Sequence, residues 1–113
     1  MSSQGTDKMT LKEMFDKSLE KWGFNSQLLM IAEEASELSV ASLHMTRNTK
    51  NATEEKRDRT LIAFANELVD VQFMIEEFVY YLKDKDVGGI TFFELLTDIR
   101  RYKEKRLQDL LRR

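Results

Sequence analysis

Two pairs of acidic residues interrupt the apolar faces of two expected helices: Glu34 with Glu37, and Glu67 with Asp70. In each pair the first acid lies one helical turn from apolar residues on both sides, so it belongs to the apolar stripe of its segment. Residues at i and i+3 lie about 60° apart around a helix, so both acids of a pair point to one side.

These four carboxylates would meet inside a helical bundle if the two segments were antiparallel neighbours. Without partners they could not all stay ionised there, because desolvation and mutual repulsion both disfavour the charged form. A divalent cation resolves this conflict, and hard oxygen ligands select Mg²⁺, Mn²⁺ or Ca²⁺ over softer metals. The spacing therefore predicts an oxygen-ligated metal site.

The same acids allow three alternatives to a metal site. An acid pair at i, i+3 on its own is typical of a solvated helix face. A di-iron bundle is disfavoured, because it needs two Glu-x-x-His motifs and the only histidine, His44, has no Glu three residues before it. The third is a non-catalytic helical module that self-associates through Met- and Phe-rich stripes. Such a module gains nothing by keeping Glu67 and Asp70 inside an apolar stripe.

The elements that must position these acids are helices. Apolar residues recur at three- and four-residue intervals, and period-two alternation is absent, so no sheet is expected. The predicted helices are residues 10–21, 25–45 and 53–83, capped at their starts by Thr10, Asn25 or Ser26, and Thr53, and a final helix opened by a Thr91–Glu94 capping box. Residues 1–8 are predicted to be a disordered lead-in and residues 47–51 a loop. The fold class is all-α, a four-helix bundle-like single domain over residues 1–113.

Composition excludes several classes of protein. The chain has 113 residues, 18 Lys+Arg, 20 Asp+Glu and no Cys, so disulfides, thiolate nucleophiles, zinc fingers and Fe–S clusters are ruled out. Apolar runs do not exceed five residues, far short of the roughly 20 that a membrane span needs. The polar first ten residues lack the apolar core of a signal peptide. The expectation is a soluble, cytoplasmic protein with no membrane partner.

Positive charge gathers at the C-terminal end, where residues 100–113 hold seven basic and two acidic side chains. The remainder of the chain is acidic, so a nucleic-acid polymer would be repelled by most of the surface and is not an expected partner. Two interpretations of the basic end stay open. It is either a solvated helix whose cations suit the helix dipole, or a group of side chains that binds a small anionic ligand.

The run Glu33-Glu34-Ala35-Ser36-Glu37, followed by Glu67-Leu68-Val69-Asp70, resembles the EExxE…ExxD signature of the MazG-like all-α nucleoside triphosphate pyrophosphohydrolases. The resemblance covers about residues 20–110. Trp22-Gly23 with Gln27 is similar to the aromatic-Gly…Gln entry of small members, and Lys103-x-x-Arg106 resembles their basic pair on the last helix. Better-known members carry an Asn near the position of Lys103.

This resemblance implies a reaction and a cofactor. MazG-like enzymes hydrolyse a (deoxy)nucleoside triphosphate between its α and β phosphates, giving a monophosphate and pyrophosphate, which serves nucleotide-pool cleansing. The resemblance implies Mg²⁺ as the cofactor, with Mn²⁺ as a substitute. The implied metal ligands, which are also catalytic, are Glu34, Glu37, Glu67 and Asp70. Glu33, one residue off the ligand face, is implied to orient water or act as an outer base. A related all-α hydrolase of another phosphoanhydride is the enzymatic alternative.

The resemblance also implies substrate contacts and assembly. Lys103 and Arg106 would neutralise phosphate charge, with a surface basic helix as the alternative. Trp22 is a candidate for stacking on the base, with core packing as the alternative, and Gln27 for hydrogen bonding its edge. His44, two turns from Glu37, is a candidate to face the same cavity, with a solvated position as the favoured alternative. MazG-like proteins are generally oligomers, so a homodimer or homotetramer is expected, and the rich apolar stripes agree with that.

Overall fold

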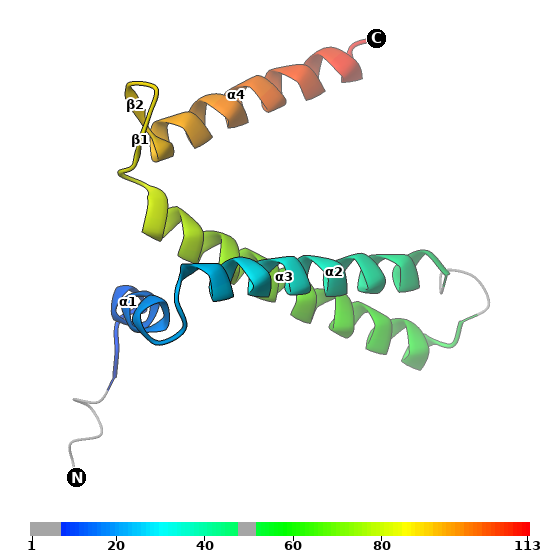
Figure 1. Cartoon of the computed structure of the whole chain (residues 1–113). Helices are drawn as coiled ribbons and strands as arrows, with labels where there is room; N and C mark the ends of the chain where they lie inside the picture. The colour runs from blue at the N-terminus through cyan, green and yellow to red at the C-terminus, as the bar shows by residue number, and fades with distance from the viewer. Residues whose placement is uncertain (1–7, 48–51) are drawn as a thin grey trace. The chain divides into compact units, whose positions relative to one another are not determined.

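Helices dominate the described part of the chain (Figure 1). A computed structural model describes residues 8–47 and 52–113. The helices are α1 (Leu11–Trp22), α2 (Phe24–Arg47), α3 (Glu54–Leu82) and α4 (Phe92–Leu111), and two short strands, β1 (Asp86–Val87) and β2 (Ile90–Thr91), precede α4. The all-α prediction is confirmed. The predictions for residues 1–7 and for 48–51 in the polar loop lie outside the described residues.

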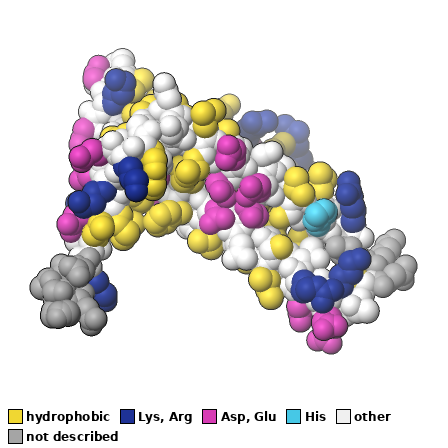
Figure 2. Space-filling view, turned by 60° about the horizontal axis from the view of Figure 1, so that its bottom comes forward, with side chains coloured by type: hydrophobic (Ala, Val, Ile, Leu, Met, Phe, Trp, Pro, Cys, Tyr) yellow, Lys and Arg dark blue, Asp and Glu magenta, His cyan; other side chains and the backbone are white. Residues whose placement is uncertain are grey.

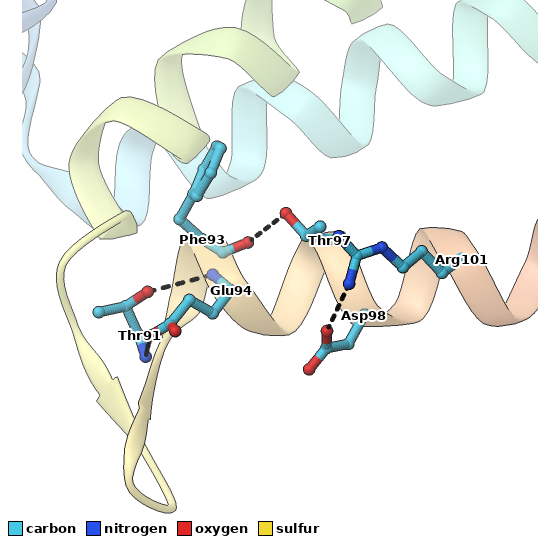
Figure 3. Close-up of polar contacts among 6 residues, drawn as sticks. All are labelled: Thr91, Phe93, Glu94, Thr97, Asp98 and Arg101. Carbon is cyan, nitrogen blue, oxygen red and sulfur yellow. Dashed lines mark hydrogen bonds and ion pairs between the residues drawn. The ribbon is translucent and has the colours of Figure 1, made fainter.

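Three helices begin at threonine caps, as predicted. The Thr10 hydroxyl accepts a hydrogen bond from Glu13 N, and the Glu13 carboxylate accepts one from Thr10 N, each at 3.1 Å. Thr91 and Glu94 form the same reciprocal capping box at the start of α4 (Figure 3). At the start of α3, the Thr53 hydroxyl accepts from Lys56 N at 3.1 Å. Each cap satisfies a backbone N–H that the first helical turn leaves without an intrahelical partner.

Gly23 joins α1 directly to α2. Its N–H donates to Leu19 O at 2.9 Å, which ends α1, and its carbonyl accepts from Gln27 N at 3.2 Å, which begins the next helix. The second helix therefore begins at Phe24, and the predicted start at Asn25 or Ser26 was late by one or two residues. A φ of 83° at residue 23 permits this connection, and glycine adopts it without a Cβ clash.

The prediction that the chain has no sheet was wrong at one place. Strands β1 and β2 pair antiparallel, with Val87 opposite Ile90. Gly88 and Gly89 form the two-residue connection, with φ of 62° and 96°. A two-residue hairpin with a type I′ turn needs positive φ at both central residues, which is why a Gly-Gly pair favours it. Strands of two residues are too short to show an alternating pattern in the sequence.

The chain divides into two compact units, Met1–Glu77 and Phe78–Arg113, and α3 runs through the division. In the first unit, α2 and the body of α3 lie side by side and run in opposite directions (Figure 1). Phe15 of α1 packs edge-on against Phe73 of α3, with ring centroids 5.5 Å apart. Phe15, Ala41 and Met74 are buried there. The antiparallel pair of helices is the frame on which the acidic residues are held.

The second unit holds the end of α3, the hairpin and α4. The rings of Phe78 and Tyr81 meet edge-to-face at 5.9 Å, and Phe92 N donates to Lys85 O at 2.8 Å, which ties the start of α4 to the strand region. Along α4, ion pairs at helical spacing, such as Arg100–Glu104 at 3.2 Å, are exposed, and exposed pairs of this kind contribute little to stability.

A membrane-crossing helix is not found among residues 8–47 and 52–113, because none of the helices there is both long and apolar enough.

Candidate metal centre

Three acidic side chains from two helices converge between α2 and α3. Glu34 extends from α2, and Glu67 and Asp70 extend from α3. One carboxylate oxygen of each lies within 4.8 Å of the others. On the face seen in Figure 2, the acidic side chains near the centre of the view lie among hydrophobic ones. Glu34 and Glu67 are half-buried, whereas Asp70 is exposed, so the group opens to solvent on the Asp70 side.

Two oxygens of this acidic cluster, defined as Glu34, Glu67 and Asp70, have no partner. The Oε2 atoms of Glu34 and of Glu67 are buried and have no hydrogen-bond partner among the described residues. Lys and Arg side chains of the described segments form no ion pair with the cluster. Because a buried charged oxygen without a donor is costly, the cluster requires a proton or a cation at this place.

The pKa values of the cluster agree with this requirement. Burial raises the pKa of Glu34, and the negative charges of Asp70, Glu37 and Glu67 raise it further. Burial also raises the pKa of Glu67, with added contributions from the charges of Glu37 and Asp70. Both carboxyls therefore hold a proton to higher pH than ordinary glutamates do, unless a cation replaces it.

The two other acids of the predicted catalytic set are placed differently. Glu37 is exposed on α2 one turn beyond Glu34, outside the group of three converging oxygens, but close enough for its charge to act on Glu34 and Glu67. Glu33 is exposed on α2 and also lies outside that group. The structure thus brings together three of the four predicted ligands and places Glu37 at their edge.

A groove runs from the cluster toward the far end of α2 and the start of α3. Its volume is about 530 Å³. It is lined by Glu37, Val40, Ala41 and His44 of α2 and by Arg59, Thr60, Ala63, Asn66 and Glu67 of α3. Arg59, Thr60 and Asn66 were not among the residues predicted for the site. A signal was available, because Thr60 and Ala63 lie seven and four residues before Glu67 and so share its side of the helix.

Gln27, predicted to contact a base, is buried in a polar pair instead. Its side chain is 1% exposed, and that of Glu77 is 4% exposed. With the amide oriented so that its nitrogen faces the carboxylate, Gln27 Nε2 donates to both Glu77 oxygens, at 3.2 and 3.0 Å. Gln27 lies two turns before Glu34 on α2, and Glu77 two turns after Asp70 on α3, so this pair forms a second polar layer in the same seam.

Trp22, predicted to stack on a base, ends α1 and is 51% exposed. It lines a largely apolar groove of about 290 Å³ together with Phe15 and Phe73, and Glu77 also contributes to the lining. The Lys21 ammonium lies 5.4 Å from the centroid of the indole ring. The ring is therefore not part of the closed core, which was the alternative for this residue.

Lys103 and Arg106, predicted to bind phosphate, are exposed on α4 in the second unit. They line different shallow depressions of that helix. Lys103 borders one with Ile99 and Leu107, whereas Arg106 borders another with Tyr102 and Asp109.

The donor set of the acidic cluster fits a hard divalent cation. It consists of carboxylate oxygens alone, two of them buried without a hydrogen-bond donor, and oxygen-only sites suit Mg²⁺, Mn²⁺ or Ca²⁺. Glu34, Glu67 and Asp70 would hold such an ion, and Glu37 lies near enough to join them through water. A cation there would remove the repulsion that raises the two pKa values.

The chain matches no protein-family model, no curated protein and no solved structure. The arrangement of its own residues therefore carries the functional argument.

Proposed function

We propose that this chain is a Mg²⁺-dependent, MazG-like nucleoside triphosphate pyrophosphohydrolase that releases a nucleoside monophosphate and pyrophosphate. Mn²⁺ is the expected substitute for Mg²⁺. The observation that carries the proposal is the acidic cluster, in which two half-buried glutamates each keep an oxygen without a donor. Its support from the sequence is the EExxE…ExxD pattern, since the cluster residues are members of both halves of that pattern.

The charges explain why such a site suits a triphosphate only when a cation is present. A triphosphate carries about four negative charges, and carboxylates at close range would repel it strongly. Glu34, Glu67 and Asp70 would hold the ion between the two helices. When bound, a divalent cation supplies Lewis-acid polarisation of a phosphoryl group and lowers the pKa of water.

The exposed acids beside the cluster supply the proton acceptor in this proposal. Water attacks the α phosphorus, the bond from that phosphorus to the oxygen bridging to the β phosphorus breaks, and pyrophosphate leaves with the bonding electrons. The proton from water passes to Glu37, which lies at the edge of the cluster and in the groove lining, with Glu33 as the outer alternative. Lys103 and Arg106 are included as phosphate-binding residues on the strength of the sequence resemblance.

Assembly into a homodimer or homotetramer is part of the proposal. Large apolar side chains on α2 and α3 remain exposed, for example Leu29 at 67%, Ile62 at 61% and Val69 at 59%. Exposed large apolar side chains can form an interface, and symmetric association is the commonest way to cover them. We also propose that the protein acts in the cytoplasm, where it would remove unwanted nucleotides from the pool.

The same exposed side chains favour a second candidate function, a non-catalytic helical module that associates with its own kind. The two candidates differ in what they require of the acids. An interaction module has no use for half-buried Glu34 and Glu67 with oxygens that lack donors, whereas a metal-dependent hydrolase needs them. An enzyme of the same type that cleaves another phosphoanhydride bond differs only in its products.

A panel of nucleotides tested with Mg²⁺ and with EDTA separates these functions. Pyrophosphate and a monophosphate as sole products, formed only with the metal, are the expected result. In ¹⁸O-enriched water, the label should enter the monophosphate, because attack is on the α phosphorus. Inorganic phosphate as the first product would refute the assigned bond and favour another phosphohydrolase, and no turnover of any nucleotide with any divalent metal would favour the interaction module.

A further inference from the structure

We infer that the groove beside the acidic cluster binds the terminal phosphates of a polyphosphate substrate, with Arg59 as the principal phosphate-binding residue and His44 beside it. This inference rests on the proposed function, since it assumes that the cluster holds the inner phosphates through a divalent cation. It assigns to α3 a phosphate-binding role that the sequence pattern had suggested only for α4.

The groove has ends of opposite charge. Glu37 and Glu67 line it at the cluster end, and His44 and Arg59 line it further along the same two helices. Seven residues separate Glu37 from His44, and eight separate Arg59 from Glu67. At a rise of about 1.5 Å per residue, the backbones of the two ends lie about 10–12 Å apart. The Arg59 side chain is long enough to bring its guanidinium closer to the acidic end than its backbone is.

Two side chains at the far end, those of His44 and Arg59, are placed to contact a ligand. Among residues 8–47 and 52–113, the side chains of Arg59 and His44 have no hydrogen-bond or ion-pair partner, and both are exposed. Asn66, closer to the cluster, likewise has no side-chain hydrogen bond with any described residue. A guanidinium offers several N–H donors in a planar fork that matches phosphate oxygens, so an unpaired Arg in a groove suits phosphate well.

The order of charges along the groove matches a metal-bound polyphosphate. Glu34, Glu67 and Asp70 would hold a divalent cation at one end of the groove, and Arg59 would contact the outermost phosphate at the other. The middle of the groove is formed by small apolar residues, Val40, Ala41 and Ala63, which leave room for a chain of phosphates. Among the described residues that line the groove there is no Phe, Tyr or Trp on which a nucleobase would stack, so phosphates rather than the base are the proposed occupant.

Calorimetric titration with tripolyphosphate in the presence of Mg²⁺ tests this role without any turnover of nucleotide. We expect Arg59→Gln to weaken binding by about 10- to 100-fold, the range for loss of a hydrogen bond to a charged group. Lys56→Gln is the matched control, because it removes one positive charge from an exposed side chain of α3 that does not line the groove. It should bind tripolyphosphate as the wild type does.

A nucleoside monophosphate is the second ligand, since it lacks the terminal phosphates. Its affinity should be unchanged in Arg59→Gln. Equal affinity of Arg59→Gln and wild type for tripolyphosphate would overturn the inference, as would an equal loss of monophosphate binding, which would place the nucleoside in the groove.

The two proposals fail in different ways. Hydrolysis that depends on Mg²⁺ and Asp70 but is indifferent to Arg59→Gln, with an unchanged KM, would leave the proposed function standing and remove this inference. Arg59-dependent binding of tripolyphosphate by a chain that hydrolyses no nucleotide would support the groove as a polyphosphate site and refute the proposed reaction.

Discussion

Glutamates of the same chain have opposite pKa shifts in two regions of this molecule. At the helix starts, backbone and hydroxyl donors of Thr10 and Thr91 lower the pKa of Glu13 and Glu94. Between α2 and α3, burial without donors and the charges of neighbouring acids raise the pKa of Glu34 and Glu67. The side chains are chemically identical, so the difference lies in the partners that the fold supplies.

The comparison separates acids that stabilise the fold from acids that the fold tolerates. A capping carboxylate receives a hydrogen bond from a backbone N–H that would otherwise lack a partner, so ionisation favours folding. A carboxylate of the cluster loses its hydration and is repelled by the neighbouring acids, so its ionisation opposes folding unless a bound cation offsets that repulsion. Residues held against stability in this way are candidates for function.

The largest expected effect is on catalysis. Asp70→Asn and Glu67→Gln should each reduce kcat strongly, because both residues are proposed as metal ligands. Loss of a residue that only hydrogen-bonds to a metal ligand costs roughly 10- to 100-fold, and the loss of a ligand itself should exceed that. Glu13→Gln is the matched control, because it changes an equally acidic side chain at a helix start and should leave kcat unchanged. Steady-state kinetics with saturating Mg²⁺ measure both. Full activity of Asp70→Asn would exclude the cluster as the catalytic site.

The next effect is stabilisation by the metal. Mg²⁺ at about 100 times its Kd should stabilise the wild type by about 2.7 kcal/mol, because the ion binds the folded chain and relieves carboxylate repulsion. Thermal denaturation with Mg²⁺ and with EDTA measures the shift in Tm. Glu67→Gln should lose most of this shift, whereas Glu13→Gln should retain it. A shift of the same size in both variants would place the ion elsewhere.

The helices, their caps and the acidic cluster were predictable from local spacing. A Thr-x-x-Glu capping box is contained in four successive residues, so the start at Thr91 needed no tertiary information. The acids were recognisable because Glu34 and Glu67 occupy positions of an apolar stripe. The hairpin was missed because its strands are only two residues long, too short to show a pattern in the sequence.

The surroundings of the cluster were less predictable, for a physical reason. An apolar stripe is recognised from its apolar residues. Polar residues on the same helix face are therefore identified as unusual only where they interrupt that stripe. Arg59 precedes the apolar stripe of α3, and its position in a groove with Glu37 depends on how α2 pairs with α3. Gln27 and Glu77 each lie seven residues from a cluster acid, a spacing that places them on the face of that acid but does not reveal the hydrogen bonds between them.

The third effect concerns the caps themselves. Thr10→Ala removes the hydroxyl that accepts from Glu13 N and should cost about 1 kcal/mol of stability, a typical value for loss of a threonine cap. Urea denaturation measures it as a lower midpoint with an unchanged m-value. Thr10→Ser retains the acceptor and should restore most of the loss. A serine variant as unstable as the alanine variant would mean that the methyl group, rather than the cap, stabilises α1.

The smallest effect, and the one that tests both regions together, is the dependence of metal-free stability on pH. The folded-state pKa of Glu67 is raised, so its contribution to stability is full below the ordinary glutamate pKa and is lost as pH rises through the raised value. The folded-state pKa of Glu13 is lowered, so its contribution to stability is present above the ordinary glutamate pKa and is lost as pH falls through the lowered pKa.

Urea denaturation midpoints of Glu67→Gln and Glu13→Gln, each compared with the wild type in EDTA, should therefore change with pH in opposite directions. Glu67→Gln should gain on the wild type as pH rises toward 7, whereas Glu13→Gln should fall behind it over the same interval. Parallel pH profiles for the two variants would contradict the comparison, because they would show that the two carboxylates have the same surroundings in the folded chain.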